Sequence, residues 1–120
     1  MVGSISELKR NLLKSFDSIY LDIFQFGVKR LSIDIVGNKI LIVGEHARLP
    51  GLQALDHSQR FVTRLTDVAL LDECKVRLKQ AIEEKMPDIR VLTVLNDYDP
   101  HTEIAATIIV TEGELLSPRN

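Results

Sequence analysis

The sequence predicts an α+β fold with the element order helix-hairpin-helix-hairpin (αββαββ). Two helical stripes of apolar residues and two pairs of short β-rich runs carry this prediction. Each pair of runs follows its helix closely, so we expect a four-stranded antiparallel sheet with the helices on one face. The length of 120 residues suits a single domain, which we place at residues 1–113, with a loose tail at residues 114–120.

The first predicted helix begins with a capping box. Ser4 is followed three residues later by Glu7, a spacing at which each side chain can satisfy a backbone donor of the first turn. We expect the helix to run to about Phe24 and Gly27 to stop it. Its apolar residues recur every three or four positions and form one stripe: Ile5, Leu8, Leu12, Phe16, Ile19 and Ile23.

The first hairpin is predicted from two β-rich runs, at about 30–36 and 39–44. The pair Gly37-Asn38 separates them, and both residues tolerate the positive φ that a two-residue turn requires. The segment from Gly44 to about Leu55 contains Pro50-Gly51 and is predicted to be a loop with a turn.

One long helix, or two helices in line, is predicted from about Asp56 to Met86. Charged residues occupy one side, and Pro87 ends the helix because it cannot donate the next backbone hydrogen bond. Its predicted inward stripe has a period near 3.6 and comprises Phe61, Leu65, Val68, Leu71, Leu78, Ile82 and Met86.

The second hairpin is predicted from a strand at Ile89–Leu95, a turn at Asn96–Thr102 and a strand at Ile104–Thr111. In the last strand we expect the alternating residues that begin with Ile104 and include Ile108 to face the helices. Ala105 and Ile109 would then lie on the opposite face of the sheet. Apolar residues there suggest cover by a second subunit, so we expect a homodimer.

Composition and charge exclude several classes of protein. Hydrophobic residues make up 45% of the chain, which is typical of a folded domain, and the net charge of −2 creates no field that would attract nucleic acid or an anionic membrane. No apolar run reaches the roughly 18 residues needed for a transmembrane segment. The amino terminus lacks the pattern of a secretory signal and Cys74 has no cysteine partner, so we expect a cytoplasmic protein.

The segment before the last strand holds the candidate binding residues. Asp97, Asp99 and His101, followed by Glu103, sit at alternate positions, where oxygens and an imidazole could converge on a divalent ion. The segment lacks the glycine and distal glutamate of a calcium-binding loop, and its Asn, Asp and Pro also suit an ordinary turn. We interpret it as a structural turn, with Asp97, Asp99 and His101 as weak binding candidates.

The remaining chemical groups fit structural roles. We expect His46 and His57 to be exposed loop residues and Cys74 to be a small buried side chain. No phosphate-binding loop follows any glycine, and no catalytic residue, metal site or cofactor is predicted. A modest basic edge near the first helix favours a solvated surface over a nucleic-acid site: Lys9, Arg10, Lys14, Lys29 and Arg30.

Three segments together resemble the MpsC family of small bacterial proteins, named for a sodium-translocating, membrane-potential-generating system. They are Val28–Val43, the end of the long helix at Leu78–Met86, and Val94–Glu103. The similarity extends from about Ile5 to Glu112 and is carried by fold-shaped patterns. The chain departs from the family pattern where Val28, and not a proline, follows Gly27.

The resemblance implies an accessory role in a bacterial ion or inorganic-carbon uptake system, beside a membrane transport protein. It supplies no catalytic residues. We therefore expect a non-enzymatic accessory or regulatory protein. The alternatives are a small metal-dependent enzyme centred on the Asp97–His101 turn and a nucleic-acid-binding module that uses the basic edge.

Overall fold

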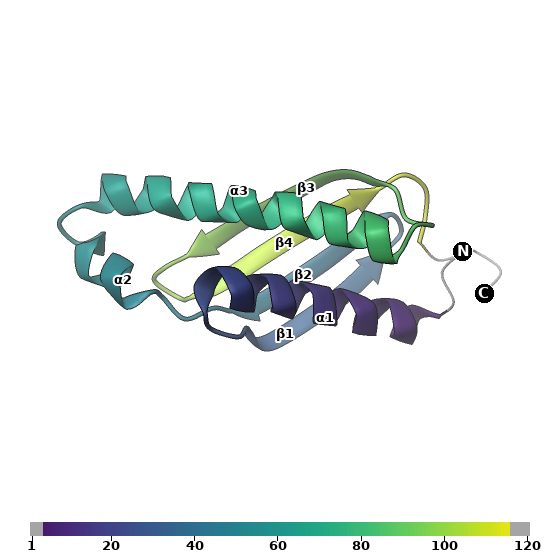
Figure 1. Ribbon diagram of the computed structural model, residues 1–120, viewed down its shortest axis with the longest axis horizontal. Helices are drawn as coiled ribbons and strands as arrows, with labels where there is room; N and C mark the ends of the chain where they lie inside the picture. Colours follow the sequence, from purple (N-terminus) through teal and green to yellow (C-terminus); the bar gives the residue numbers. More distant parts are fainter. Residues whose placement is uncertain (1–3, 116–120) are drawn as a thin grey trace.

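The computed structural model describes residues 4–115 as two long helices, one short helix and four strands (Figure 1). The elements, in chain order, are α1 (Ile5–Phe24), β1 (Lys29–Val36), β2 (Lys39–Glu45), α2 (Pro50–Asp56), α3 (Arg60–Lys85), β3 (Val91–Asp99) and β4 (Ile104–Thr111).

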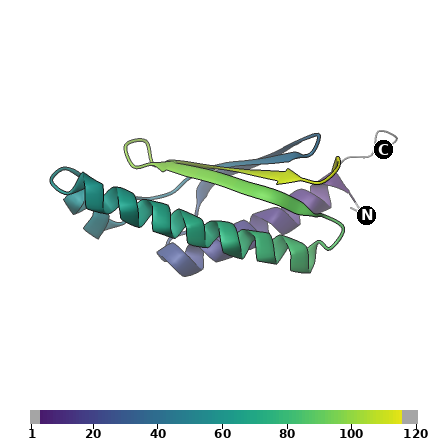
Figure 2. The same cartoon turned by 90° about the horizontal axis from the view of Figure 1, so that it is seen from above.

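The four strands form one antiparallel sheet in the order β1-β2-β4-β3, so the two hairpins lie side by side with β2 and β4 at the centre. Both long helices lie on the same side of this sheet, and within residues 4–115 its other side carries no helix (Figure 2). The predicted α+β fold with helices on one face is therefore confirmed.

Helix α1 begins at the predicted cap and ends at Phe24, as predicted. The Ser4 hydroxyl accepts a hydrogen bond from the Glu7 backbone N–H at 3.0 Å. Gln25 ends the helix in the left-handed conformation, with φ of 67°, and its N–H donates to the Leu21 carbonyl. The prediction of Gly27 as the stop is wrong, because a glutamine here takes the conformation that glycine usually supplies.

The first hairpin turns at Gly37, whose φ of 62° suits a residue without a Cβ atom. The segment after β2 differs from the prediction, because residues 50–56 form the short helix α2 instead of a loop. Pro50 opens it, at a position where the missing N–H would be unpaired in any case. The break at Pro87 is confirmed, since α3 ends at Lys85 and Met86 is non-helical.

The predicted faces of β4 are reversed in the structure. Ala105 and Ile109 are 5% and 0% exposed and lie under the helices, whereas Ile104 and Ile108 are 45% and 36% exposed on the outer face. Alternation shows that the two faces differ but does not say which one is buried. Here threonines share the inner face, and Thr111 is accommodated there because its hydroxyl donates to the Asn38 carbonyl at 3.1 Å.

The prediction is also wrong for the first half of α3, where the apolar stripe that was expected to face inward is exposed. Phe61, Leu65 and Val68 are 77%, 56% and 39% exposed, whereas Thr63 and Asp67 are 0% and 4% exposed. From Leu71 onward the predicted stripe is confirmed as buried. The core lies between this second half of α3, helix α1 and the inner face of the sheet.

The second hairpin is longer than predicted. Strand β3 continues through Asp99, so the chain turns at residues 100–103 and not from Asn96 onward. Of the predicted loose tail, residues 116–120 lie outside the described part of the chain. Within that part, the Leu115 N–H donates to the Gly37 carbonyl at 3.0 Å. None of the described helices is both long and apolar enough to span a membrane.

Candidate functional site

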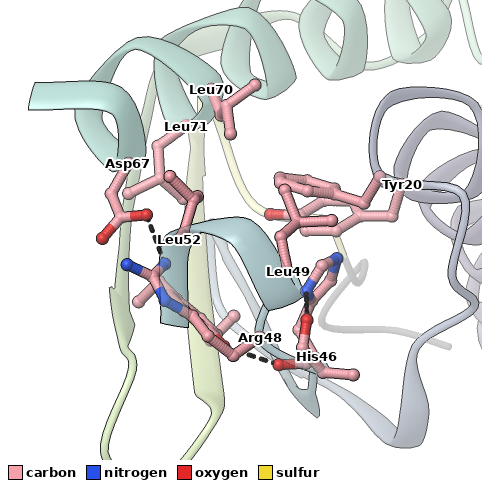
Figure 3. A pocket seen from close by; sticks show the side chains of 12 residues that line it. Tyr20, His46, Arg48, Leu49, Leu52, Asp67, Leu70 and Leu71 are labelled. Atoms are coloured by element: carbon pink, nitrogen blue, oxygen red, sulfur yellow. Dashed lines mark hydrogen bonds and ion pairs between the residues drawn. The ribbon is translucent and has the colours of Figure 1, made fainter. Parts of the chain in front are cut away.

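The most densely charged part of the interior is centred on Arg48, in the segment between β2 and α2. Its guanidinium binds Asp56 through two hydrogen bonds of 2.9 and 2.6 Å and binds Asp67 through one of 2.5 Å. The side chains of Arg48 and Asp67 are both only 4% exposed. Figure 3 shows these two side chains pointing toward one another, Asp67 from α3 and Arg48 from the segment that leads into α2.

Arg60, at the start of α3, completes the charge cluster. One of its nitrogens donates to Asp67 at 3.2 Å and to the buried Thr63 hydroxyl at 3.0 Å, so both oxygens of Asp67 face an arginine. The hydrogen bonds from Arg48 lower the pKa of Asp56. Burial disfavours the charged form of Arg48, but its hydrogen bonds with the two aspartates outweigh this effect and raise its pKa. The cluster joins two arginines to two aspartates, so its formal charges balance.

This cluster explains the reversed orientation of the first half of α3. Asp67 must face inward to meet Arg48, and Thr63, one turn earlier, follows it. The opposite side of the same turns then carries Phe61 and Leu65 into solvent. The cluster therefore ties α2 and α3 to the end of the sheet and leaves an apolar stripe uncovered.

His46 lies beside the cluster and packs against three aromatic rings. The ring centroids of Phe24, Tyr20 and Tyr98 lie 4.2, 5.2 and 5.8 Å from that of His46, all in edge-on geometry. His46 is 4% exposed, which overturns the prediction that it is an exposed loop residue. Its Nδ1 contacts the Ala47 carbonyl at 3.2 Å, and its Nε2 has no hydrogen-bond partner among the described residues.

The interior around His46 leaves little free space. The cavity bordered by Tyr20, His46, Arg48 and Tyr98 has a volume of about 20 Å³, which is room for about one water molecule and not for an organic ligand. Burial lowers the pKa of His46, so the imidazole is neutral at neutral pH. Burial, followed by the Glu103 carboxylate, raises the pKa of Tyr98 to about 12. These groups form a packed polar interior.

Cys74 has the properties of a structural residue, as predicted. It is 2% exposed on α3, and burial raises the pKa of its thiol to about 11. The reactive form of cysteine is the thiolate, which such a pKa keeps scarce at neutral pH. The side chain therefore fills the core beside Tyr20.

The three binding candidates from the sequence do not come together. Asp97 lies on the outer face of the sheet and pairs with Arg64 at 3.3 Å. Asp99 and His101 instead line an open groove of about 350 Å³ between the β3–β4 turn and the residues Asp56 and Arg60. The His101 backbone N–H donates to the Asp99 carboxylate at 2.9 Å and is the main cause of a lowered Asp99 pKa.

The geometry of this groove does not resemble a metal centre. Among residues 4–115, no three His, Cys, Asp or Glu side chains are close enough together to hold a metal ion. Glu103, the fourth residue of the alternating set, binds the segment after β2 instead. Its carboxylate accepts the Arg48 backbone N–H at 2.6 Å, and its backbone carbonyl accepts the His46 N–H at 2.7 Å.

The sequence did contain a signal for the buried charge cluster. When the buried positions Leu78, Cys74 and Leu71 are continued backward at helical spacing, the next inward positions are Asp67 and Thr63. Two polar residues in the inward phase of a long helix indicate a buried polar partner elsewhere in the chain. The sequence alone does not identify Arg48 as that partner, because the segment that carries it reads as a loop.

The outer face of the sheet carries apolar side chains that the helices leave uncovered. Its central strands carry Leu41 on β2 and Ile104 and Ile108 on β4, and Leu95 adds to it from β3; these side chains are 36–54% exposed. Strand register places Leu41 beside Ile108 and Ile108 beside Leu95, so the side chains form a continuous patch. Contiguous exposed apolar patches of this kind mark interaction surfaces.

Comparison with known proteins adds no relative: no family model, no curated protein and no solved structure matches the chain. The described fold and surfaces define the chain as a small α+β protein with a filled polar interior and an uncovered sheet face.

Proposed function

We propose that this protein is a non-enzymatic accessory or regulatory protein that acts through the outer face of its sheet, where a second copy binds to form a homodimer. The observation that carries this proposal is the continuous apolar patch around Leu41, Ile108 and Leu95. A sheet with one face against helices normally has a polar second face or a partner on it.

The arrangement of the ionisable groups supports a non-catalytic role. The most buried charges, on Arg48 and Asp67, are matched to each other, and the space beside them holds about one water molecule. Enzymatic sites instead combine a concave space for a substrate with polar groups directed into it.

The resemblance to the MpsC family supplies the cellular setting of the proposal. The protein would act in the bacterial cytoplasm, beside a membrane transport protein for an ion or inorganic carbon. Deleting the gene would then lower uptake of labelled sodium or bicarbonate by the cells. A copy of the wild-type gene should restore uptake, and a copy that encodes Ile108→Lys should not.

A matched control separates the sheet face from a general effect of added charge. Val76 is 54% exposed on α3, in the helix layer, so Val76→Lys adds the same charge on the opposite side of the molecule. This variant should restore uptake as the wild type does. Normal uptake in the deletion strain would contradict the proposed setting.

The open groove at Asp99 and His101 favours one alternative, a small metal-dependent enzyme. Calorimetric titration with calcium, magnesium, manganese and zinc tests it. The accessory role predicts only weak, unselective binding, because exposed carboxylates attract cations without forming a site. Selective binding below about 10 μM that disappears in an Asp99→Ala, His101→Ala variant would support the enzyme instead.

A further inference from the structure

The outward side chains of the central strands are complementary to those of a second copy that runs in the opposite direction. Along β2 the outward residues are Lys39, Leu41, Val43 and Glu45, which is a cation, two apolar side chains and an anion. If a second β2 lies over the first in the opposite direction, Lys39 meets the other copy's Glu45 and Leu41 meets the other copy's Val43. Both charges and both apolar side chains are matched by this reversal.

Strand β4 accepts the same reversal. Its outward residues are Ile104, Ala106, Ile108 and Val110, all apolar. When a second β4 runs antiparallel over the first, Ile104 meets the other copy's Val110 and Ala106 meets the other copy's Ile108. A large side chain therefore lies over a small one near the centre. Interdigitation of large and small residues is how two sheet faces pack about 10 Å apart.

We infer that, in the homodimer on which this inference rests, the two sheets pack face to face with β2 of one copy running antiparallel over β2 of the other. The two-fold axis lies between the sheets, across the strands, level with Ile42 and Thr107. Such an interface is isologous, so each Lys39–Glu45 contact occurs twice.

The other two-fold arrangement is less favourable for a specific reason. An axis parallel to the strands would place β2 over β4, so Lys39 would lie on Val110 and Glu45 on Ile104. Lys39 and the Glu45 carboxylate, which pairs with Arg30 at 3.0 Å, would then lose water against apolar side chains without gaining a charged partner on the other copy, which is costly. Charge complementarity therefore selects the crossing in which β2 pairs with itself.

The edges of the sheet suit the rim of this interface. Outward positions on β1 include Ser32 and Asp34, and those on β3 include Asp97, which is paired with Arg64. Interfaces commonly have an apolar centre and a polar, hydrated rim. The β2–β4 centre, with Ser32, Asp34 and Asp97 at its flanks, follows that order, and Leu95 extends the apolar centre onto β3.

The area of the face limits how tight the dimer is. Four strands spaced about 4.8 Å apart, each about eight residues long, cover a footprint of roughly 500 Å², or roughly 1,000 Å² over both copies. This lies at the lower bound of stable interfaces. We therefore expect dissociation in the micromolar range and a monomer–dimer mixture that responds to dilution.

Charge exchange tests the arrangement. Lys39→Glu and Glu45→Lys should each weaken self-association at least about tenfold, because each places like charges opposite one another. Mixing the two variants should give a heterodimer of near wild-type affinity, since each of the two contacts then joins a glutamate of one variant to a lysine of the other. Sedimentation velocity across a dilution series measures all three affinities.

Matched variants on the helix layer control for overall charge. Lys79→Glu and Glu83→Lys make the same two charge changes on the exposed side of α3, and neither should alter self-association. One outcome would overturn the proposed crossing of the two β2 strands but leave the homodimer standing. In it, the wild type dimerises and Ile108→Lys is monomeric, but the charge-exchange variants stay dimeric or fail to form a heterodimer when mixed. A wild type that stays monomeric at several hundred micromolar would overturn both.

Discussion

The guanidinium of Arg48 donates to the carboxylate of Asp67 at 2.5 Å inside the protein, with only 4% of either side chain exposed. The residues are 19 positions apart, with Arg48 in the segment between β2 and α2 and Asp67 on α3. Their contact fixes which side of α3 faces inward and thereby which apolar residues are left on the surface. The shape of the exposed surface thus depends on a buried ion pair.

Removing the charge of Asp67 should destabilise the fold strongly. Asp67→Ala leaves Arg48 buried with one carboxylate fewer, and the loss of one partner from a buried pair costs about 3–5 kcal/mol. Urea denaturation followed by circular dichroism gives the free energy of unfolding. Asp72→Ala is the control on the same helix, because its side chain is 63% exposed and pairs with Lys75 at the surface; we expect a change within about 0.5 kcal/mol. Equal effects of both variants would refute a special role for the buried pair.

Stability should depend on pH through His46. Burial lowers its pKa in the folded state below the ordinary value of 6.5, so the unfolded chain binds a proton more readily. The contribution of His46 is fully present above pH 6.5 and is lost as the pH falls from there toward the lower folded pKa. His46→Phe should flatten this part of the pH profile of the melting temperature.

His57→Gln is the matched control for that titration, because His57 is exposed at the end of α2. Its pH profile should follow the wild type. The lowered pKa of Asp56 acts below its ordinary value of 3.8, whereas the loss of the His46 contribution begins as the pH falls through 6.5. A profile that stays unchanged in His46→Phe would contradict the assignment.

The exposed stripe of α3 should contribute little to stability although it is apolar. Leu65→Ser should change the free energy of unfolding by less than about 0.5 kcal/mol, because Leu65 is 56% exposed. Leu78→Ala, at a buried position of the same helix that is 3% exposed, should cost about 2–5 kcal/mol. A large loss in Leu65→Ser would mean that the stripe packs inward after all.

Cys74 should react with thiol reagents only after the fold opens. Its thiol is buried and its pKa is raised to about 11, so both access and thiolate formation limit the reaction. Labelling followed by absorbance in a urea series should track the unfolding transition. Rapid, complete labelling of the native protein would be inconsistent with this packing.

The sequence predicted the elements of this fold better than their orientations. Capping at Ser4, the turn at Gly37 and the break at Pro87 depend on local chemistry, and the structure confirms all three. The inward side of β4 and of the first half of α3 depends on long-range contacts. Apolar residues on both faces of β4 made its two orientations equivalent in the sequence.

The candidate site at Asp97, Asp99 and His101 likewise depended on contacts that the local sequence does not show. Asp97 and Asp99 are close in sequence, but β3 continues through Asp99, and an extended strand holds alternate residues about 6–7 Å apart. Each carboxylate then meets a different partner, Arg64 for Asp97 and the His101 N–H for Asp99.

In the charge cluster of Arg48, Asp56, Arg60 and Asp67, the contacts of Arg48 are made by the tertiary fold. Its members come from the segment after β2, from α2 and from α3. Spacing along α3 marks Asp67 as an inward polar position, but it could not identify Arg48 as the partner, because that contact depends on how α2 and α3 dock onto the sheet.

Sedimentation equilibrium on the wild type and Ile108→Lys at micromolar concentrations tests the central claim most directly. The claim is that the outer sheet face binds a second copy. We expect the wild type to approach twice the chain mass of 13.5 kDa as concentration rises. Ile108→Lys should remain at the chain mass and keep the circular dichroism spectrum of the wild type. A wild type that stays at the chain mass throughout, or a variant that dimerises equally well, would contradict the account.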